Sequence, residues 1–356
     1  MLTPNPVGQK WLAEGETMIA AHKCRISAAM LAVGLALGSC GGEGNVSGTP
    51  ILSAPSPTPS ATPSPTGGTW QLIWADEFDG AELDTSRWNM IADCWGGGNN
   101  ERQCYTARPE NIAIENGVLS LIAREESYTG DAWPAHMAPF QSDPDEQRTQ
   151  PFTSGKITTK GNASWLYGRF EMRARLPQGQ GTWPAFWMLP EDEDYGGWPL
   201  SGEIDIMEAV NLGVECADCE AGGEHSVLGT LHFGNSPPNN VYRGREIAFP
   251  GVLDGEFHTY GVIWEEGRFT WSIDGEPFGT MEASEWFTAA STAPNAPFDR
   301  PFHLILNFAV GGNWPENTSA GGVSAEGFPK RLEVDWVRVW QCDADPASGQ
   351  GCTGGN

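Results

Sequence analysis

The chain has 356 residues, enough for one large or two small domains, and its 45 glycines, 27 prolines and 16 tryptophans favour a loop-rich all-β protein over a helical one. The net charge of −26 argues against nucleic acid or an anionic membrane surface as partner, and it is compatible with a neutral polysaccharide. Tryptophan is a common stacking surface for sugar rings, although many of these side chains are expected in the core.

The first forty residues predict an export signal. Lys23 and Arg25 precede an apolar run at 26–37 that is too short to span a membrane as a mature helix. The run ends in Leu-Gly-Ser-Cys, which resembles a bacterial lipobox, so Cys40 is predicted to be lipidated; an ordinary signal peptide with a chance cysteine is the alternative. Met18 is a candidate true start. We expect an exported protein, either secreted or lipid-anchored at a bacterial outer membrane or cell surface, with no other membrane contact.

Three further segments follow the signal. Residues 41–69 are dominated by Gly, Ser, Thr and Pro and predict an extended tether. Residues 70–342 contain short alternating runs separated by Gly, Pro and Asp, which predict antiparallel strands stacked as a sandwich, and residues 343–356 are expected to form a flexible tail. The clearest runs are 117–123, 168–176, 257–264, 268–275 and 332–340.

The cysteines support export. Of the eight, one lies in the signal and one in the lipobox, and an even number remains, which in an exported chain predicts disulfides. A zinc or redox site at the CxxC sequence is the alternative, but no second CxxC and no suitable histidine cluster completes it. The predicted pairs are Cys94 with Cys104, Cys216 with Cys219, and Cys342 with Cys352.

The stretch 202–210 carries the chemistry. Read as a strand, it points Glu203 and Asp205 to one face and its isoleucines to the other. Strict alternation would bury the charged Glu208 carboxylate beside those isoleucines, which would destabilise the fold by roughly several kcal/mol. One extra residue near Met207, a β-bulge, would return Glu208 to the acidic face.

Three carboxylates on one face of a short strand suit glycoside hydrolysis with retention. That reaction needs a nucleophilic carboxylate and a protonated acid about 5–5.5 Å apart. Like charges at such a distance separate their pKa values, so that one group is ionised while the other is protonated near neutral pH. Asp205 could share a proton with Glu203. An exposed acidic strand on an acidic protein is the structural alternative.

The sequence Glu203 to Glu208 matches the bulged ExDxxE signature of glycoside hydrolase family 16, and its surroundings resemble the laminarinase branch, the endo-β-1,3-glucanases. The other matching stretches follow the family's order and cover nearly all of 70–340; they are 74–80, 99–103, 181–189, 198–199, 229–234 and 306–315. The resemblance implies a β-jelly-roll of two curved antiparallel sheets with an open concave cleft. It also implies retaining, endo-acting hydrolysis of laminarin-like glucan, with mixed β-1,3/1,4-glucan as a further candidate, by a protein that we expect to be monomeric.

The resemblance implies that Glu203 is the nucleophile, Glu208 the general acid/base and Asp205 an assisting carboxylate; the strand argument alone leaves open which glutamate has which role. Spacing places Trp183 and Trp187 on one strand face. Several of the predicted sugar contacts have a structural alternative. One of the two tryptophans could belong to the core, a lone histidine such as His232 is more often structural than functional, and Asn99 or Asn100 would by itself be interpreted as part of a turn. The sugar contacts that the resemblance implies are Trp183, Trp187, His232, Asn99 or Asn100, and Trp314.

No cofactor is expected for catalysis, but many family members hold a structural calcium ion, at positions that match Glu77, the carbonyl of Gly117 and Asp335. Three alternatives remain open. The chain could be a glycan-binding lipoprotein without activity, a transglycosylase with the same covalent intermediate, or an agarase- or carrageenase-like enzyme. The insertions at 211–225 and 128–149 could shift the linkage preference.

Overall fold

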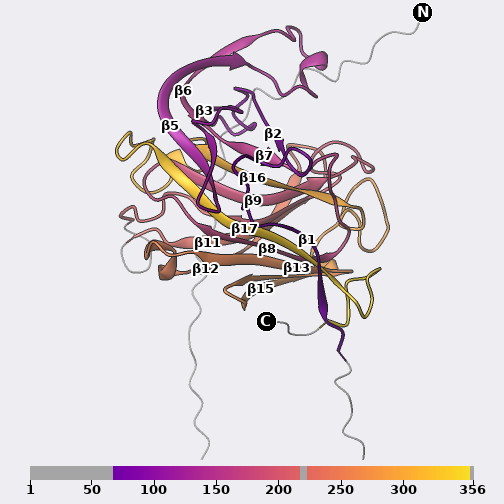
Figure 1. The fold of residues 1–356 in the computed structure, drawn as a ribbon. Helices are drawn as coiled ribbons and strands as arrows, with labels where there is room; N and C mark the ends of the chain where they lie inside the picture. The colour runs from indigo at the N-terminus through magenta and orange to yellow at the C-terminus, as the bar shows by residue number, and fades with distance from the viewer. Residues whose placement is uncertain (1–66, 217–222, 353–356) are drawn as a thin grey trace, which may run out of the picture. The chain divides into compact units, whose positions relative to one another are not determined.

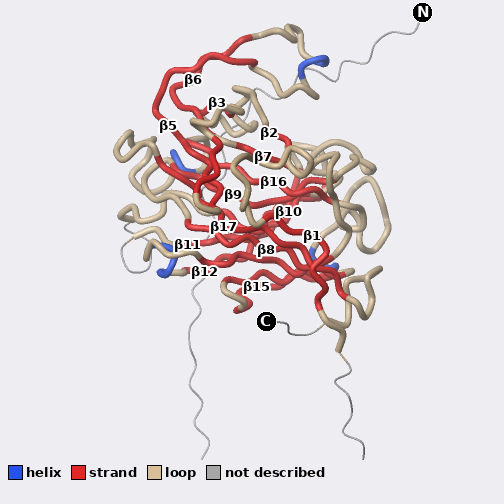
Figure 2. Tube along the Cα trace, viewed as in Figure 1, coloured by secondary structure: helices blue, strands red, loops and turns tan. Residues whose placement is uncertain are grey.

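The computed structural model describes residues 67–216 and 223–352. The predicted signal, Cys40 and the tether as far as residue 66 lie outside the described residues, as does Cys219. Strands in two sheets are the main regular structure of the described chain, and the helices are short 3-10 turns (Figure 2). The predicted all-β jelly-roll is confirmed. Within the described ranges no helix has the length and apolar character needed to cross a bilayer.

One sheet has ten strands, and its neighbours pair antiparallel except for one parallel pair, β3 with β6. Two of its strands lie outside the main order: β1 (Trp70–Asp76) pairs with β17, and β4 (Ile112–Glu115) pairs with β5. The remaining strands follow in the order β15 (Glu276–Glu282), β14 (Arg268–Ile273), β13 (His258–Glu265), β8 (Gly168–Arg175), β17 (Lys330–Cys342), β5 (Val118–Asp131), β6 (Gln147–Ser154) and β3 (Gln103–Tyr105).

The second sheet has seven strands and is antiparallel throughout. Its order is β12 (Asn240–Ala248), β11 (Ser226–Gly234), β10 (Glu203–Glu208), β9 (Thr182–Pro190), β16 (Phe302–Val310), β7 (Lys156–Thr158) and β2 (Asn89–Met90). The 3-10 turns are η1 (Ala138–Phe140), η3 (Pro250–Leu253), η4 (Ala283–Glu285) and η5 (Pro315–Asn317).

A single aromatic and aliphatic core lies between the sheets. Phe186 and Ile204 of the seven-stranded sheet are fully buried, as are Trp264 and Phe269 of the other sheet. The core reaches the acidic strand directly, because the buried Trp271 indole donates a hydrogen bond to the backbone carbonyl of Asp205 at 2.9 Å. The backbone of β10 is therefore supported from within the core.

The polar excursion predicted at 128–149 is a ribbon. β5 and β6 continue as a pair beyond the sheet and form an arch that carries η1 (Figure 1). The first half of β5 is buried and its second half alternates with exposed residues. The base of the arch is tied to the disulfide of Cys94 with Cys104, since the Cys94 amide donates to the Asp131 carbonyl at 2.7 Å.

The structure also pairs Cys342 with Cys352. Cys216 is in a disulfide, and its predicted partner lies outside the described residues. Residues 343–352 of the predicted tail are packed, because Ser348 and Cys352 are buried and the Glu266 amide donates to the Ser348 carbonyl at 2.7 Å. The disulfide and these contacts extend the compact unit beyond Cys342, and the same unit begins at Gly67, within the predicted tether.

Gly229 on β11 lies against Trp271, and a Cβ atom there would be 2.1 Å from Cδ1 of that indole. We therefore expect Gly229→Ala to lower the free energy of unfolding by about 1–3 kcal/mol, because overpacking displaces a buried side chain. Gly244→Ala on the neighbouring strand is the matched control, since its nearest atom would be the Thr230 hydroxyl at 3.3 Å. Denaturant unfolding measures both, and equal midpoints would contradict the prediction.

Candidate active site

The predicted bulge lies in β10. On one side of β10, Asp205 pairs with Trp187 and Glu208 pairs with Ala185, so three steps along β10 match two steps along β9. The pairing with β11 shows the same shift between Asp205 and Glu208. Since paired residues of adjacent strands point to the same side, Asp205 and Glu208 share a face. We call the side of this sheet that carries Glu203, Asp205 and Glu208 the carboxylate face.

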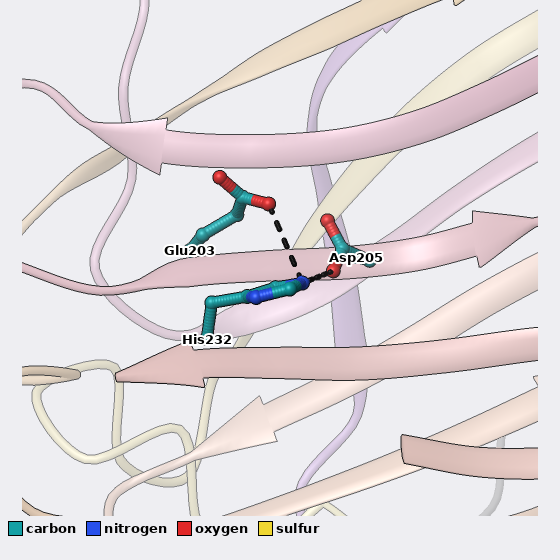
Figure 3. A group of neighbouring side chains, drawn as sticks. All are labelled: Glu203, Asp205 and His232. Atoms are coloured by element: carbon teal, nitrogen blue, oxygen red, sulfur yellow. Dashed lines mark ion pairs between the residues drawn. The ribbon is translucent and has the colours of Figure 1, made fainter. Parts of the chain in front are cut away.

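A histidine joins two of the carboxylates (Figure 3). His232 on β11 is the direct partner of Glu203, and its Nε2 lies 3.2 Å from Asp205 Oδ2 and 3.7 Å from Glu203 Oε1. The Asp205 side chain is 4% exposed, whereas that of Glu203 is 15% exposed. The aspartate is therefore internal to the cluster, and the glutamate is the group that reaches the surface.

Burial sets the protonation of this cluster. It raises the pKa of Glu203, to which the charge of Glu208 adds. Burial and the charge of Glu203 raise the pKa of Asp205 to about 7, and burial and the charge of Asp205 raise the pKa of Glu208 to about 8. Burial opposes the charged form of His232, but Glu203 and Asp205 outweigh it and raise the histidine pKa to about 9. At neutral pH this arrangement favours a protonated Glu208 beside a cationic His232.

The cluster also has the spacing of metal ligands, because one ligand atom each of Glu203, Asp205 and His232 lies within 4.8 Å of the other two. The same atoms form the contacts of His232 Nε2 with Asp205 Oδ2 and Glu203 Oε1, at 3.2 and 3.7 Å. The ion pairs within the cluster are therefore the better account of its arrangement.

Two tryptophan indoles hold the glutamates. Trp183 Nε1 donates to Glu208 Oε1 at 2.9 Å, and Trp198 Nε1 donates to Glu203 Oε2 at 2.7 Å. Trp198 was not among the predicted site residues, although the Trp-Pro pair at 198–199 was one of the stretches that resemble the family. Each glutamate thus has one indole N–H that fixes its side chain.

Both predicted tryptophans of β9 lie on the carboxylate face and are partly exposed. Trp187 pairs directly with Asp205, and its indole N–H donates to Asn307 Oδ1 at 2.6 Å. The Lys156 ammonium lies 4.9 Å from the Trp187 ring centroid. Asn307 and Lys156 were not predicted as site residues. They are directly paired with each other on β16 and β7, and Asn307 is paired through Ala185 on β9 with Glu208 on β10.

The structure brings the remaining predicted residues to one side of Trp183. The ring of Trp314 is 5.4 Å from that of Trp183 in an edge-to-face arrangement. The Asn100 side chain donates to Asn313 Oδ1 at 2.9 Å, and the Asn313 amide donates to the Asn99 carbonyl at 2.8 Å. The loop that holds the two asparagines is thus fastened to the turn that holds Trp314.

Two of the three residues predicted to bind calcium, Glu77 and Asp335, are paired with arginines. Both oxygens of Glu77 accept from the Arg338 guanidinium, at 2.8 Å each. Asp335 Oδ2 forms an ion pair with Arg173 at 2.5 Å. Carboxylates that already neutralise arginines offer little to a divalent cation, and the guanidinium charges would repel it.

The family model that matches residues 70–342 is described as "Beta-porphyranase A-D, GH16 domain". The chain is 41% identical over 281 residues to a glucan endo-1,3-beta-glucosidase A1 of Niallia circulans, covering 76% of this chain and 38% of that protein. A glucan endo-1,3-beta-glucosidase of Cryptopygus antarcticus is 40% identical, covering 77% of this chain and 93% of the relative.

Among solved structures, the laminarinase of Rhodothermus marinus is similar with a TM-score of 0.63 and 38% identity, covering 77% of this chain and 98% of the other. The family model and the relatives carry different activities in their names, but both fall in the same family. By this match and these identities, the chain belongs to glycoside hydrolase family 16.

Proposed function

We propose that this protein hydrolyses β-1,3-glucan at internal bonds and retains the anomeric configuration. The observation that carries the proposal is the bulge in β10, which puts Glu203, Asp205 and Glu208 on one face. The names of the two relatives at 40–41% identity support β-1,3-glucan as the substrate. Mixed β-1,3/1,4-glucan is included as a further substrate of the same site.

In the proposed mechanism, Glu203 attacks the anomeric carbon and Glu208 donates its proton to the departing glycosidic oxygen. The raised pKa of Glu208, about 8, supports the acid role, because a general acid must be protonated at the working pH. The indole of Trp198 and the cationic His232 both favour the ionised form of Glu203, as a nucleophile requires.

In the second half of the reaction, Glu208, now ionised, takes a proton from water, and the resulting hydroxide displaces Glu203 from the sugar. His232 contacts both Asp205 and Glu203, and Asp205 is assigned to holding the histidine in position beside Glu203. Trp183 and Trp187 are assigned as stacking surfaces for glucosyl rings, with Asn99, Asn100 and Trp314 extending the contact on the Trp183 side.

Porphyran is the second candidate substrate, because the description of the family model names β-porphyranases. Binding of a sulfated polysaccharide would require several Lys or Arg side chains near the reacting carboxylates, to pair with the sulfate groups. Around β10 the described contacts include one lysine, Lys156, and the chain carries a net charge of −26. These charges favour a neutral glucan.

Release of reducing sugar from laminarin, lichenan, porphyran, agarose and carrageenan separates these substrates. We expect laminarin to be cleaved fastest, to a ladder of oligosaccharides from the first minutes, with lichenan slower. Activity confined to porphyran or agarose would overturn the proposal, and binding without cleavage would favour the glycan-binding lipoprotein. Sizes of the products from one defined oligosaccharide separate hydrolysis from transglycosylation.

We also propose that the mature protein is a monomer anchored through a lipid on Cys40 at a cell surface, with residues 41–66 as a tether. The support is the lipobox-like sequence and the Pro-rich composition that follows it. Labelling with a radioactive fatty acid tests this, and Cys40→Ala should abolish the label.

A further inference from the structure

We propose that a chain of buried hydrogen bonds ending at Glu101 positions the Trp187 ring and thereby determines how tightly glucan binds; this inference rests on the proposed function. The chain, which we call the Glu101 relay, consists of Trp187, Asn307, Tyr105 and Glu101. None of its last three members was predicted as a site residue.

The relay runs in one direction. The Trp187 N–H donates to Asn307 Oδ1 at 2.6 Å, the Asn307 amide donates to the Tyr105 hydroxyl at 3.1 Å, and that hydroxyl donates to Glu101 Oε2 at 3.4 Å. An indole N–H can only donate, so Asn307 Oδ1 accepts and the Asn307 amide group donates to the Tyr105 hydroxyl, whose own proton is then directed to Glu101 Oε2. Hydrogen bonds aligned in this way polarise one another.

The relay is shielded from water. Glu101, Tyr105 and Asn307 are 7%, 4% and 6% exposed, so water does not replace a member that is lost. A donor left without its acceptor at such a depth destabilises its present position, and the side chain is free to turn. The orientation of Asn307, and through it that of Trp187, therefore depends on Tyr105.

The far end of the relay is fixed to the scaffold. Gln103 Nε2 donates to Glu101 Oε2 at 2.6 Å, while Gln103 Oε1 accepts from the Val310 amide at 2.8 Å on β16, the strand that also carries Asn307. The loop over Glu101 packs so closely that a Cβ atom on Gly97 would be 2.0 Å from Glu101 Oε1. Glu101 is therefore a firm terminal acceptor.

Trp187 is the member at the surface. It pairs with Asp205, so its ring lies beside the reacting carboxylates, and the Lys156 ammonium lies 4.9 Å from its centroid and 5.6 Å from that of Tyr105. A ring held at one angle presents a preformed platform to a sugar, whereas a ring that rotates must be ordered on binding. Loss of the relay should consequently raise KM and leave the chemical step nearly unchanged.

Tyr105→Phe tests the relay, because it removes one hydroxyl and preserves the ring. Tyr260→Phe is the matched control, since Tyr260 is equally buried and its hydroxyl has no hydrogen-bond partner among the described residues. On laminarin we expect Tyr105→Phe to raise KM about fivefold, the factor that one neutral hydrogen bond represents, with kcat within about twofold. Tyr260→Phe should match the unaltered protein.

A double-mutant cycle identifies the route of the effect. Trp187→Phe removes the donor at the start of the relay. The double variant Trp187→Phe/Tyr105→Phe should therefore have the same KM as Trp187→Phe alone. An equal KM increase in both backgrounds would show that Tyr105 does not act through Trp187 and would overturn the proposal. If Tyr105→Phe lowers Tm well below that of Tyr260→Phe, Glu101→Leu replaces it in the same cycle, because leucine is of similar size and removes the acceptor of the Tyr105 hydroxyl; the same two outcomes apply.

The two proposals fail in different ways. An unaltered protein that does not cleave laminarin contradicts the proposed function. A protein that cleaves laminarin, but in which Tyr105→Phe and Tyr260→Phe have the same KM, contradicts the Glu101 relay alone.

Discussion

Glu203→Gln should lower kcat on laminarin by about 10⁴-fold or more while leaving Tm and glucan binding nearly unchanged. The substitution removes the charge and nucleophilicity of the carboxylate, and loss of a nucleophile eliminates the covalent route entirely. The amide oxygen can still accept from the Trp198 indole, which lies 2.7 Å from Glu203 Oε2, so the local structure should persist. Reducing-sugar release and thermal unfolding measure the two effects, and an active variant would refute the role of Glu203.

Azide separates the roles of the two glutamates. In a Glu203→Ala variant, azide can enter the space of the lost carboxylate and displace the leaving group once, which gives an α-glycosyl azide. In Glu208→Ala, Glu203 still forms the glycosyl-enzyme, and azide then displaces it, which gives a β-glycosyl azide. An activated aryl glycoside as substrate makes both rescues measurable. The opposite pair of products would show that the roles of Glu203 and Glu208 are exchanged.

The bulge was predictable from local sequence because the free-energy cost of burying the Glu208 carboxylate outweighed every other local effect. A buried Glu208 would have lost its hydration among isoleucines, and no nearby residue could compensate, so a single extra residue in β10 was the least costly arrangement. The register of β10 with both neighbours confirms it. The face of Trp183 and Trp187 follows from the same alternation.

Contacts across the fold were not predictable in this way. Asn307 and Tyr105 are 202 positions apart, and nothing local to either marks it as the other's partner. The arginine partners at the predicted calcium positions were not predictable for a related reason. Arg338 and Arg173 reach Glu77 and Asp335 only once β1, β8 and β17 are aligned in the ten-stranded sheet. Period-two patterns identify strands, but the order of strands in a sheet is a long-range property.

The activity of the protein should fall on the alkaline side with a midpoint between about pH 7 and 8. The acid must be protonated to assist the leaving group, and burial together with the mutual charge of Asp205 and Glu208 raises their pKa values to about 7 and 8. Because the two carboxyls interact, the midpoint belongs to the pair. The pH dependence of kcat/KM on laminarin measures it in the free enzyme.

Glu208→Ala should remove this alkaline decline, since the variant lacks the carboxyl that titrates. An aryl glycoside with an activated leaving group is the substrate, because that group departs without a proton and the variant therefore keeps measurable activity. Glu246→Gln is the matched control. Glu246 is exposed on β12 and pairs with Leu228, which in turn pairs with Glu208. Glu246→Gln should leave the decline in place. An alkaline midpoint unchanged in Glu208→Ala on that substrate would assign the titration to another group.

The stability of the folded protein should also depend on the protonation of Glu208, and the direction of this pH dependence follows from the raised pKa. The folded pKa of Glu208, about 8, lies above the ordinary value of 4.5, so between these pH values the folded protein binds more protons than the unfolded chain. The contribution of Glu208 to stability is therefore present at low pH and is lost as pH rises toward 8. Glu208→Gln keeps a neutral group at this position, so the Tm of the variant minus that of the unaltered protein should increase between pH 5 and 9. A difference that stays constant or decreases over that range would mean that Glu208 is already ionised in the folded protein at neutral pH, which would remove it as the general acid.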